Sequence, residues 1–226
     1  MFQFLDLSLS TTDVYEEVLR RVKAGDKFLD LGCCLGQEIR QLVHDGAPST
    51  NTYGSDLWEG LMEVGYELFR DRERLQTTFI AADVFDDASA LVGALAGRVD
   101  IVYTGAFFHL FGLEEQERAA MRVVQLLAPR SGSLVVGRQS GSEEAGEFSS
   151  SRAGDKRGGG RKHFRHNPQS WKELWDRVGE KTGTKWEVEA DVRTREYTLA
   201  AELEGKSEAI RQKMTGKGLR FVVRRL

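Results

Sequence analysis

The chain has few cysteines, and this scarcity excludes two kinds of structure. Only two of its 226 residues are cysteines, and they are adjacent, Cys33 and Cys34. Neighbouring cysteines without other thiols to pair with cannot form a disulfide framework. A zinc site needs more soft ligands at workable spacing. We therefore interpret both as reduced residues packed in a turn, and we expect no metal site.

Long apolar runs and an excess of basic charge are also missing. No apolar stretch approaches the ~20 residues of a membrane span, and the N-terminal MFQFLDLSLS has no basic leader of the kind that opens a signal peptide. The formal net charge is −3, whereas phosphate-binding domains usually carry a basic excess. The sequence therefore predicts a cytoplasmic protein with a small-molecule ligand and without nucleic-acid or membrane partners.

The overall composition is typical of one soluble α/β domain with a substantial buried core, since 40 % of the residues are hydrophobic and 30 % are charged. We expect a single domain over residues 1–226. Residues 1–26 form its short N-terminal helical segment, in which Asp13 and Glu16 have the spacing of a capping box.

Strand and helix patterns alternate along the first two thirds of the chain. The expected strands are 27–31, 52–57, 77–81, 99–103 and 133–136, and the expected helices are 37–44, 58–69, 88–95 and 113–127. Such alternation predicts a mostly parallel sheet with helices on both faces. Ligands of such sheets bind beyond the carboxyl ends of the strands, where the strand order reverses.

Residues 139–163 interrupt this alternation. They are rich in Gly and Ser with charges of both signs, which predicts a flexible loop or a lid. Their basic run is short and balanced by acidic residues, which favours a solvated loop over an RNA-binding patch. A further helix is expected after Asn167 and Pro168, the N-cap and first helical positions, and strands are expected at 186–190 and 219–225.

Carboxylates follow three successive strands of the expected sheet: Asp30, Asp56 and Asp83. A carboxylate at the end of a second strand can accept hydrogen bonds from both ribose hydroxyls of an adenosine. Asp83 lies where an acceptor meets an adenine amino group, and the backbone N–H of Val84 is available to a ring nitrogen. The three strand ends therefore indicate an adenosine-containing ligand.

The first strand runs into the turn FLDLGCCLGQE, residues 28–38. A dinucleotide pyrophosphate requires G-x-G-x-x-G, whereas this turn has Gly32 and Gly36 in D-x-G-x-x-x-G. The nearby carboxylate of Asp30 is unfavourable for a pyrophosphate but suits a ligand with an ammonium and a sulfonium. S-adenosylmethionine has both and no phosphate, and its carboxylate can accept backbone N–H groups at the helix start.

Four motifs in this order, FLDLGCCLGQE, GSDLW, AADVF and TGAFFHLF, resemble those of class I S-adenosylmethionine-dependent methyltransferases. The finer pattern, with LDLGCCLGQEIRQLV and FRHNPQSWKELWDRVGEKTGTKW, is similar to fungal methyltransferases of meroterpenoid and related natural-product clusters, some of which esterify a carboxyl group. The resemblance covers most of residues 27–190. It implies a Rossmann-like fold with a mostly parallel seven-stranded sheet, S-adenosylmethionine as cofactor and S-adenosylhomocysteine as product.

The resemblance also assigns roles to individual positions. It implies that the methionine portion of the cofactor lies along Asp30, Gly32, Cys33 and Gly36, the ribose at Asp56 and Leu57, the adenine at Asp83 and Val84, and the sulfonium side at Thr104 and Gly105. Two departures stand out. Cys34 occupies a position where many relatives have glycine, which narrows the turn. Only about 26 residues precede the first strand, which indicates a shortened form of the family.

Methyl transfer is an in-line displacement, so positioning of the acceptor contributes most of the catalysis. A base helps a protonated acceptor such as a phenol, whereas a carboxylic acid is already ionised at neutral pH. His109 follows the fourth strand and is a candidate base or hydrogen-bond donor, or else a packed histidine. His166 with Arg165 is a candidate binder of a substrate carboxylate, or else a capping residue. Aromatic residues form either an apolar pocket or part of the core: Tyr103, Phe107, Phe108, Phe111 and Phe164.

Taken together, the sequence predicts an S-adenosylmethionine-dependent O-methyltransferase of secondary metabolism that acts on a small, mostly apolar natural product, with a carboxyl group as one candidate acceptor. The alternatives are a protein or RNA methyltransferase and a non-catalytic relative that keeps the cofactor site. The turn pattern disfavours a nicotinamide-dependent oxidoreductase. A homodimer is one candidate for the assembly of the protein.

Overall fold

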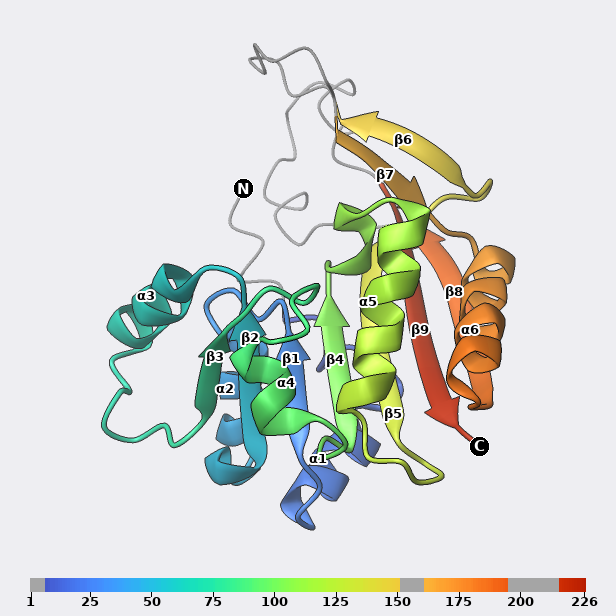
Figure 1. Ribbon diagram of the computed structural model, residues 1–226. Coiled ribbons are helices and arrows are strands. Elements are labelled where there is room, and N and C mark those ends of the chain that lie inside the picture. The colour runs from blue at the N-terminus through green and yellow to red at the C-terminus, as the bar shows by residue number, and fades with distance from the viewer. Residues whose placement is uncertain (1–6, 151–160, 195–215) are drawn as a thin grey trace.

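The computed structural model describes residues 7–150, 161–194 and 216–226 (Figure 1). Within these residues, seven strands form one sheet in the order β3-β2-β1-β4-β5-β9-β8. The strands are β1 (Phe28–Leu31), β2 (Thr52–Asp56), β3 (Thr78–Ala81), β4 (Ile101–Gly105), β5 (Leu134–Ser140), β8 (Trp186–Thr194) and β9 (Lys217–Arg225). The first five are parallel, and β9 runs antiparallel to both β5 and β8. The predicted α/β fold class and its mostly parallel sheet are confirmed.

The strand order reverses beside β1. Its first residue, Phe28, pairs with Thr52 of β2 on one side and with Ile101 of β4 on the other. The chain therefore builds the sheet outward from β1 to β3 and then crosses back to β4. Such a switch point leaves a crevice beyond the carboxyl ends of the strands, because the connections on its two sides leave in opposite directions.

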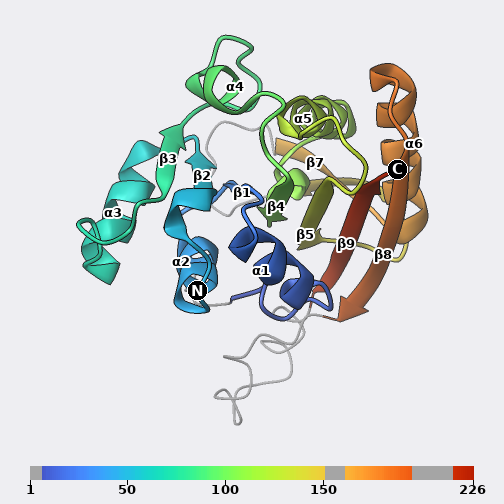
Figure 2. The ribbon, with the colours of Figure 1, turned by 90° about the horizontal axis from the view of Figure 1, so that it is seen from below.

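Helices cover both faces of the sheet (Figure 2). They are α1 (Tyr15–Lys23), α2 (Gln37–His44), α3 (Glu59–Phe69), α4 (Ala90–Leu95), α5 (Leu113–Leu126) and α6 (Pro168–Thr182), with the short 3-10 turns η2 (Ser49–Asn51) and η3 (Phe108–Leu110). One buried apolar cluster joins the sheet to α1 and α2, and the other joins it to α4, α5 and α6. Because both faces are covered, all four residues of β1 are buried, as is typical of parallel sheets.

The two predicted helix starts have different outcomes. At α6 the side chain of Asn167 accepts a hydrogen bond from the Ser170 N–H at 2.8 Å, with Pro168 as the first helical residue, so this N-cap is confirmed. The capping box predicted at Asp13 is wrong. Helix α1 begins at Tyr15 after Val14, without a side-chain cap. The N–H of Tyr15 already donates to the carbonyl of Thr12 at 3.2 Å, so it has a partner without the Asp13 side chain.

The segment 139–163 differs from the loop that its composition indicates. Strand β5 continues to Ser140, and two further strands, β6 (Gly146–Ser150) and β7 (Arg161–Arg165), pair antiparallel. Residues 151–160 lie outside the described residues. The composition does not reveal this hairpin, because β7 pairs with β6 and contacts η3 and Gln116 of α5, which are distant in sequence. Figure 1 shows the hairpin beyond the carboxyl ends of the central strands.

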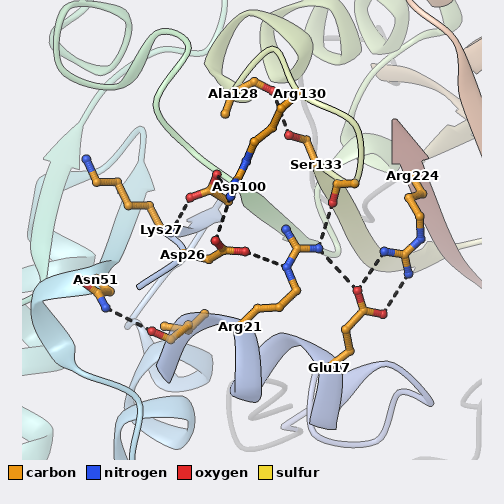
Figure 3. Close-up of polar contacts among 12 residues, drawn as sticks. Glu17, Arg21, Asp26, Lys27, Asn51, Asp100, Ala128, Arg130, Ser133 and Arg224 are labelled. Carbon is orange, nitrogen blue, oxygen red and sulfur yellow. Dashed lines mark hydrogen bonds and ion pairs between the residues drawn. The ribbon is translucent and has the colours of Figure 1, made fainter. Parts of the chain in front are cut away.

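A network of ion pairs connects α1 to β9 and to the segment before β1 (Figure 3). Arg224 of β9 donates two hydrogen bonds to Glu17, both of 2.8 Å. Arg130 bridges Asp100 at 2.6 Å and Asp26 at 2.8 Å. Asp100 and Asp26 precede β4 and β1, so the network lies at the amino ends of these strands. It therefore fixes the framework rather than the crevice at their carboxyl ends.

Helix α3 lies directly on the turn that follows β1. A Cβ atom at Gly65 would be 2.3 Å from the carbonyl oxygen of Leu35, which is closer than real Cβ contacts allow. Gly60, in the first turn of the same helix, has no heavy atom within 4 Å of its Cβ position. Only Gly65 is therefore required by the packing of the helix against the turn.

We predict that Gly65→Ala destabilises the protein by about 1–3 kcal/mol, because the added methyl group overpacks the contact with Leu35. Gly60→Ala is the matched control, and it should be neutral or stabilising by up to about 1 kcal/mol because alanine has the higher helix propensity. Urea unfolding of both variants measures the difference. Equal unfolding midpoints for the two variants would contradict the close approach.

Candidate active site

A cavity of about 670 Å³ lies at the carboxyl ends of the parallel strands. Its walls come from the segments that follow β1, β2, β3 and β4, from the end of β5 and from β7. The lining residues are Leu31, Gly32, Ser55, Asp56, Leu57, Trp58, Ala82, Asp83, Val84, Phe85, Ala106, Phe107, His109, Leu110, Phe111, Ser140, His163 and Arg165. Its volume is in the range of sites for cofactors and small molecules.

Backbone N–H groups orient both carboxylates in the wall of the cavity. Asp56, at the end of β2, accepts hydrogen bonds from the N–H of Cys34 at 2.9 Å and of Trp58 at 3.2 Å. Asp83, after β3, accepts one from the N–H of Phe85 at 2.9 Å. Each carboxylate oxygen has two lone pairs, so both side chains can still accept hydrogen bonds from a ligand.

The turn after β1 is bonded to β2. The N–H groups of Gly32 and Cys33 both donate to the carbonyl of Ser55, at 2.8 and 3.0 Å. Gly32 has φ +81° and Cys34 has φ +51°, which is the left-handed region that favours glycine. Cys34 therefore adopts a backbone conformation that favours glycine, and in this conformation its N–H reaches Asp56. Burial raises the pKa of both thiols, Cys33 and Cys34, so the thiolate forms are disfavoured.

Asp30 lies under this turn rather than in the wall. Its side chain is 2 % exposed, and its Oδ2 atom has no hydrogen-bond partner in the structure. Burial raises the pKa of this carboxyl group well above its usual value, and the charges of Glu38 and Asp56 add to the effect. Glu38 is itself held by the N–H and hydroxyl of Ser8 and by the N–H of Leu9. A cation near Asp30 would relieve this unfavourable burial of negative charge.

The opposite side of the cavity is aromatic. Phe111 contacts Phe107 and Phe85 edge to face, with ring centroids 5.3 and 5.1 Å apart. His109 and Leu110 of η3 lie beside them, and His163 and Arg165 enter from β7. The cavity thus has carboxylates beyond β2 and β3, and the side chains of His109, Phe111, His163 and Arg165 beyond β4 and on β7. Phe85, which follows β3, joins the two sides through its contact with Phe111.

The structure places about half of the predicted site residues in the cavity wall: Gly32, Asp56, Leu57, Asp83, Val84 and His109. The others are not among the residues that line it: Asp30, Cys33, Gly36, Thr104, Gly105 and His166. Gly36 caps α2 with φ +70° and packs against Phe79. Thr104 is buried, and its hydroxyl has no hydrogen-bond partner in the structure. The roles of these residues remain predictions.

His166 is fully buried, and its Nδ1 atom lies 2.9 Å from the hydroxyl of Ser170. Its ring packs between Phe164 and Trp171. His163, two positions earlier in β7, lines the cavity instead. The structure therefore brings His109 together with His163 and Arg165, and not with His166.

Sequence reasoning misses several wall residues. Trp58 and Phe85 directly follow the predicted site residues Leu57 and Val84, so their sequence positions could have predicted that they line the cavity. Ser140 and His163 had no such signal, because the pairing of β6 with β7 joins distant segments. Of the aromatic residues considered for a pocket, Phe107 and Phe111 line the cavity. Tyr103 and Phe108 belong to the core.

Across the ranges 7–150, 161–194 and 216–226, no helix has the length and apolar character required to cross a membrane. In the same ranges, no group of three or more His, Cys, Asp or Glu side chains is arranged to hold a metal ion. The described residues form an α/β domain with a cavity at its topological switch point.

Residues 28–130 match the family model described as a methyltransferase domain. The chain is 49 % identical over 199 residues to O-methyltransferase phiE of Fungal sp. (strain ATCC 74256), covering 87 % of this chain and 64 % of that protein. It is 46 % identical over 188 residues to methyltransferase adrK of Penicillium roqueforti, covering 82 % of this chain and 65 % of that protein. The chain belongs to the class I S-adenosylmethionine-dependent methyltransferase family. It spans a little under two thirds of the length of these relatives.

The same fold occurs in a solved structure of a SAM-dependent methyltransferase from Methanosarcina mazei. The TM-score is 0.61 at 13 % sequence identity, and the match covers 95 % of this chain and 99 % of that chain. At this identity the likeness concerns the fold alone.

We predict that His166 makes the protein less stable in acid. Burial lowers its pKa from 6.5 to about 4, and the positive charge of Arg177 adds to the effect. Between these two pKa values the unfolded chain binds a proton that the folded chain does not bind. Stability therefore falls as the pH falls from about 6.5 to about 4, by up to ~3 kcal/mol.

The comparison with His166→Gln isolates this contribution. Buried carboxyl groups with raised pKa values, such as Asp30, act in the opposite sense, but they are present in both proteins. We expect denaturant unfolding to show a wild-type advantage at pH 7 that shrinks toward pH 4. Parallel stability curves for the two proteins over this range would refute the assignment.

Proposed function

We propose that this domain is an S-adenosylmethionine-dependent O-methyltransferase of secondary metabolism that acts on a small, mostly apolar natural product. The observation that carries the proposal is the cavity at the switch point, with Asp56 and Asp83 in its wall beyond adjacent parallel strands. The names of the relatives support the reaction class, since phiE is an O-methyltransferase and adrK is a methyltransferase.

The residues present fit this cofactor and do not fit a dinucleotide. The cavity contains carboxylates on the side of the glycine turn, and the unpartnered Oδ2 atom of Asp30 lies beneath that turn. Arg40, the nearest cation on α2, is engaged with both oxygens of Asp71, at 2.7 and 3.0 Å. A pyrophosphate at this turn would meet negative charge, whereas an ammonium and a sulfonium are favoured there.

We assign the cofactor contacts to residues of the β1, β2 and β3 side. Asp56 and Leu57 hold the ribose, and Asp83 and Val84 hold the adenine. When bound, S-adenosylmethionine supplies an electrophilic methyl group. Arg122 of α5 supports the adenine side, because its Nε donates to the carbonyl of Val84 at 2.9 Å and keeps this loop in place.

The acceptor lies on the β4 and β5 side in this proposal. Phe85, Phe107 and Phe111 enclose an apolar group and exclude water, and this enclosure fixes the acceptor atom in line with the methyl group. His109 is positioned to take a proton from a hydroxyl acceptor. A carboxylate acceptor needs no base, because it is ionised at neutral pH.

A small molecule fits this cavity better than a protein or RNA substrate. Its aromatic wall suits one enclosed apolar group, and the formal net charge of −3 gives the chain no general attraction for RNA. The two cysteines are free, which fits the proposed cytoplasmic location. The homodimer remains a prediction, and sedimentation of the whole chain tests it.

We predict that the chain binds S-adenosylhomocysteine and that Asp56→Asn and Asp83→Asn each weaken this binding by roughly tenfold to a hundredfold, since hydrogen bonds to charged acceptors contribute about 1.5–3 kcal/mol each. Isothermal titration calorimetry measures the affinities. Asp176→Asn is the matched control, because Asp176 pairs with Lys172 on the exposed face of α6.

The control should bind as tightly as the wild type. A folded wild-type protein that shows no binding at millimolar S-adenosylhomocysteine would reject the cofactor assignment. Cofactor binding without methyl transfer to any member of a broad panel of hydroxyl and carboxyl acceptors would instead support the non-catalytic relative.

A further inference from the structure

We infer that Arg165 is the residue that recognises an anionic group on the methyl acceptor, and that Phe148 positions it for this task. The inference rests on the proposed function, because it concerns the acceptor half of the same cavity. If Arg165 has this role, the protein selects acceptors by their negative charge as well as by their size.

The pairing of the hairpin decides which charges face the cavity. Directly opposite residues share a face of an antiparallel pair, and successive residues alternate between faces. Arg165 pairs with Gly146 and His163 pairs with Phe148, so these four residues share one face. Lys162 and Glu147 lie on the other face, where they form an ion pair of 3.1 Å. Glu147 therefore does not neutralise Arg165.

Phe148 holds the guanidinium group from one side. The Cζ atom of Arg165 lies 4.5 Å from the centroid of the Phe148 ring, and the ring of His163 stacks on the same phenyl group at 6.2 Å. Gly146, opposite Arg165, has open space around its Cβ position, with no heavy atom within 4 Å, so no group packs there against Arg165. Stacking engages one face of the group and leaves its N–H edge free for a planar anion.

Arg165 has no anionic partner within the part of the chain that the structure describes. Its Nε atom is buried without a hydrogen-bond partner, and none of the ion pairs of these residues includes it. A half-buried cation without a partner is unfavourable. An anion that enters the cavity would supply the missing interaction, and a carboxylate matches the two-pronged geometry of arginine.

The hairpin is fixed to the wall that encloses the acceptor. The N–H of Phe164 donates to the carbonyl of Phe111 at 3.0 Å. The side-chain amide of Gln116 donates to the carbonyls of Phe164 and Phe111, at 2.8 and 3.0 Å. Arg165 is thus tied through its neighbour to the segment that contains His109. Its position relative to the acceptor site is set by backbone contacts rather than by a free loop.

For a carboxylate acceptor the charges balance without a proton. A carboxylate oxygen forms a bond to the methyl carbon while the sulfur–carbon bond breaks, and both the negative and the positive charge disappear. Arg165 therefore stabilises the anionic ground state more than the transition state, in which this charge is fading. Its loss should raise KM more than it lowers kcat. The neutral ester has no charge left for Arg165, which favours product release.

The test uses the whole chain saturated with S-adenosylhomocysteine and two probes of the same ring system, 1-naphthoate and neutral 1-naphthylmethanol. Titration calorimetry or ligand-observed NMR gives the ratio of their affinities. We expect the wild type to prefer the anion, and Arg165→Met to reduce this preference by roughly tenfold to a hundredfold. Arg165→Lys should restore part of it, and Phe148→Leu should give an intermediate ratio.

Lys162→Met is the matched control, because it removes a cation from the same strand, three positions before Arg165 and on the opposite face of β7. It should leave the ratio unchanged. S-adenosylhomocysteine affinity is measured separately for every variant, so a failure of cofactor binding is recognised as a failure of the proposed function.

With cofactor binding intact, three results would overturn the inference. The first is a wild type without preference for the anion, including one that binds neither probe. The second is an unchanged ratio in Arg165→Met. The third is a loss of S-adenosylhomocysteine affinity in that variant, which would place Arg165 at the cofactor instead.

Discussion

The hydrogen bonds between the turn after β1 and the end of β2 are the constraint on which the rest of the site depends. Two N–H groups of the turn share the carbonyl of Ser55, and the next N–H, from Cys34, reaches the carboxylate of Asp56. The carboxylate of Asp56 and the glycine turn therefore cannot move independently. Gly65 lets α3 pack against the same turn from outside. The turn after β1 and the end of β2, joined in this way, both contribute residues to the cavity wall.

This constraint explains how a cysteine can occupy a position typical of glycine. A left-handed residue with a side chain costs on the order of 1 kcal/mol. At Cys34 the conformation brings a backbone N–H to a carboxylate, and hydrogen bonds to charged groups are stronger than neutral ones. The interaction with Asp56 offsets the strain. The side chain of Cys34 is not among those that line the cavity.

The charges of the cavity are divided between its two sides. Carboxylates lie beyond β2 and β3, and the nitrogen-bearing side chains His109, His163 and Arg165 lie beyond β4 and on β7. In the proposed function, the first side favours a cationic cofactor and the second favours an anionic or protic acceptor. Such a division orients two reactants of opposite charge toward each other, which is what an in-line transfer between them requires.

The sequence by itself determined the alternation of strands and helices, the mostly parallel sheet and the carboxylates at the strand ends. These features are local, since each strand and the residue that follows it lie in one short segment. Only the tertiary structure decided that His163 and Arg165, rather than His166, line the cavity. The reason is physical: β7 pairs with a strand that composition alone does not reveal, and in a strand a shift of one residue moves a side chain to the opposite face. The orientation of His166 thus followed from long-range pairing, which no local pattern specifies.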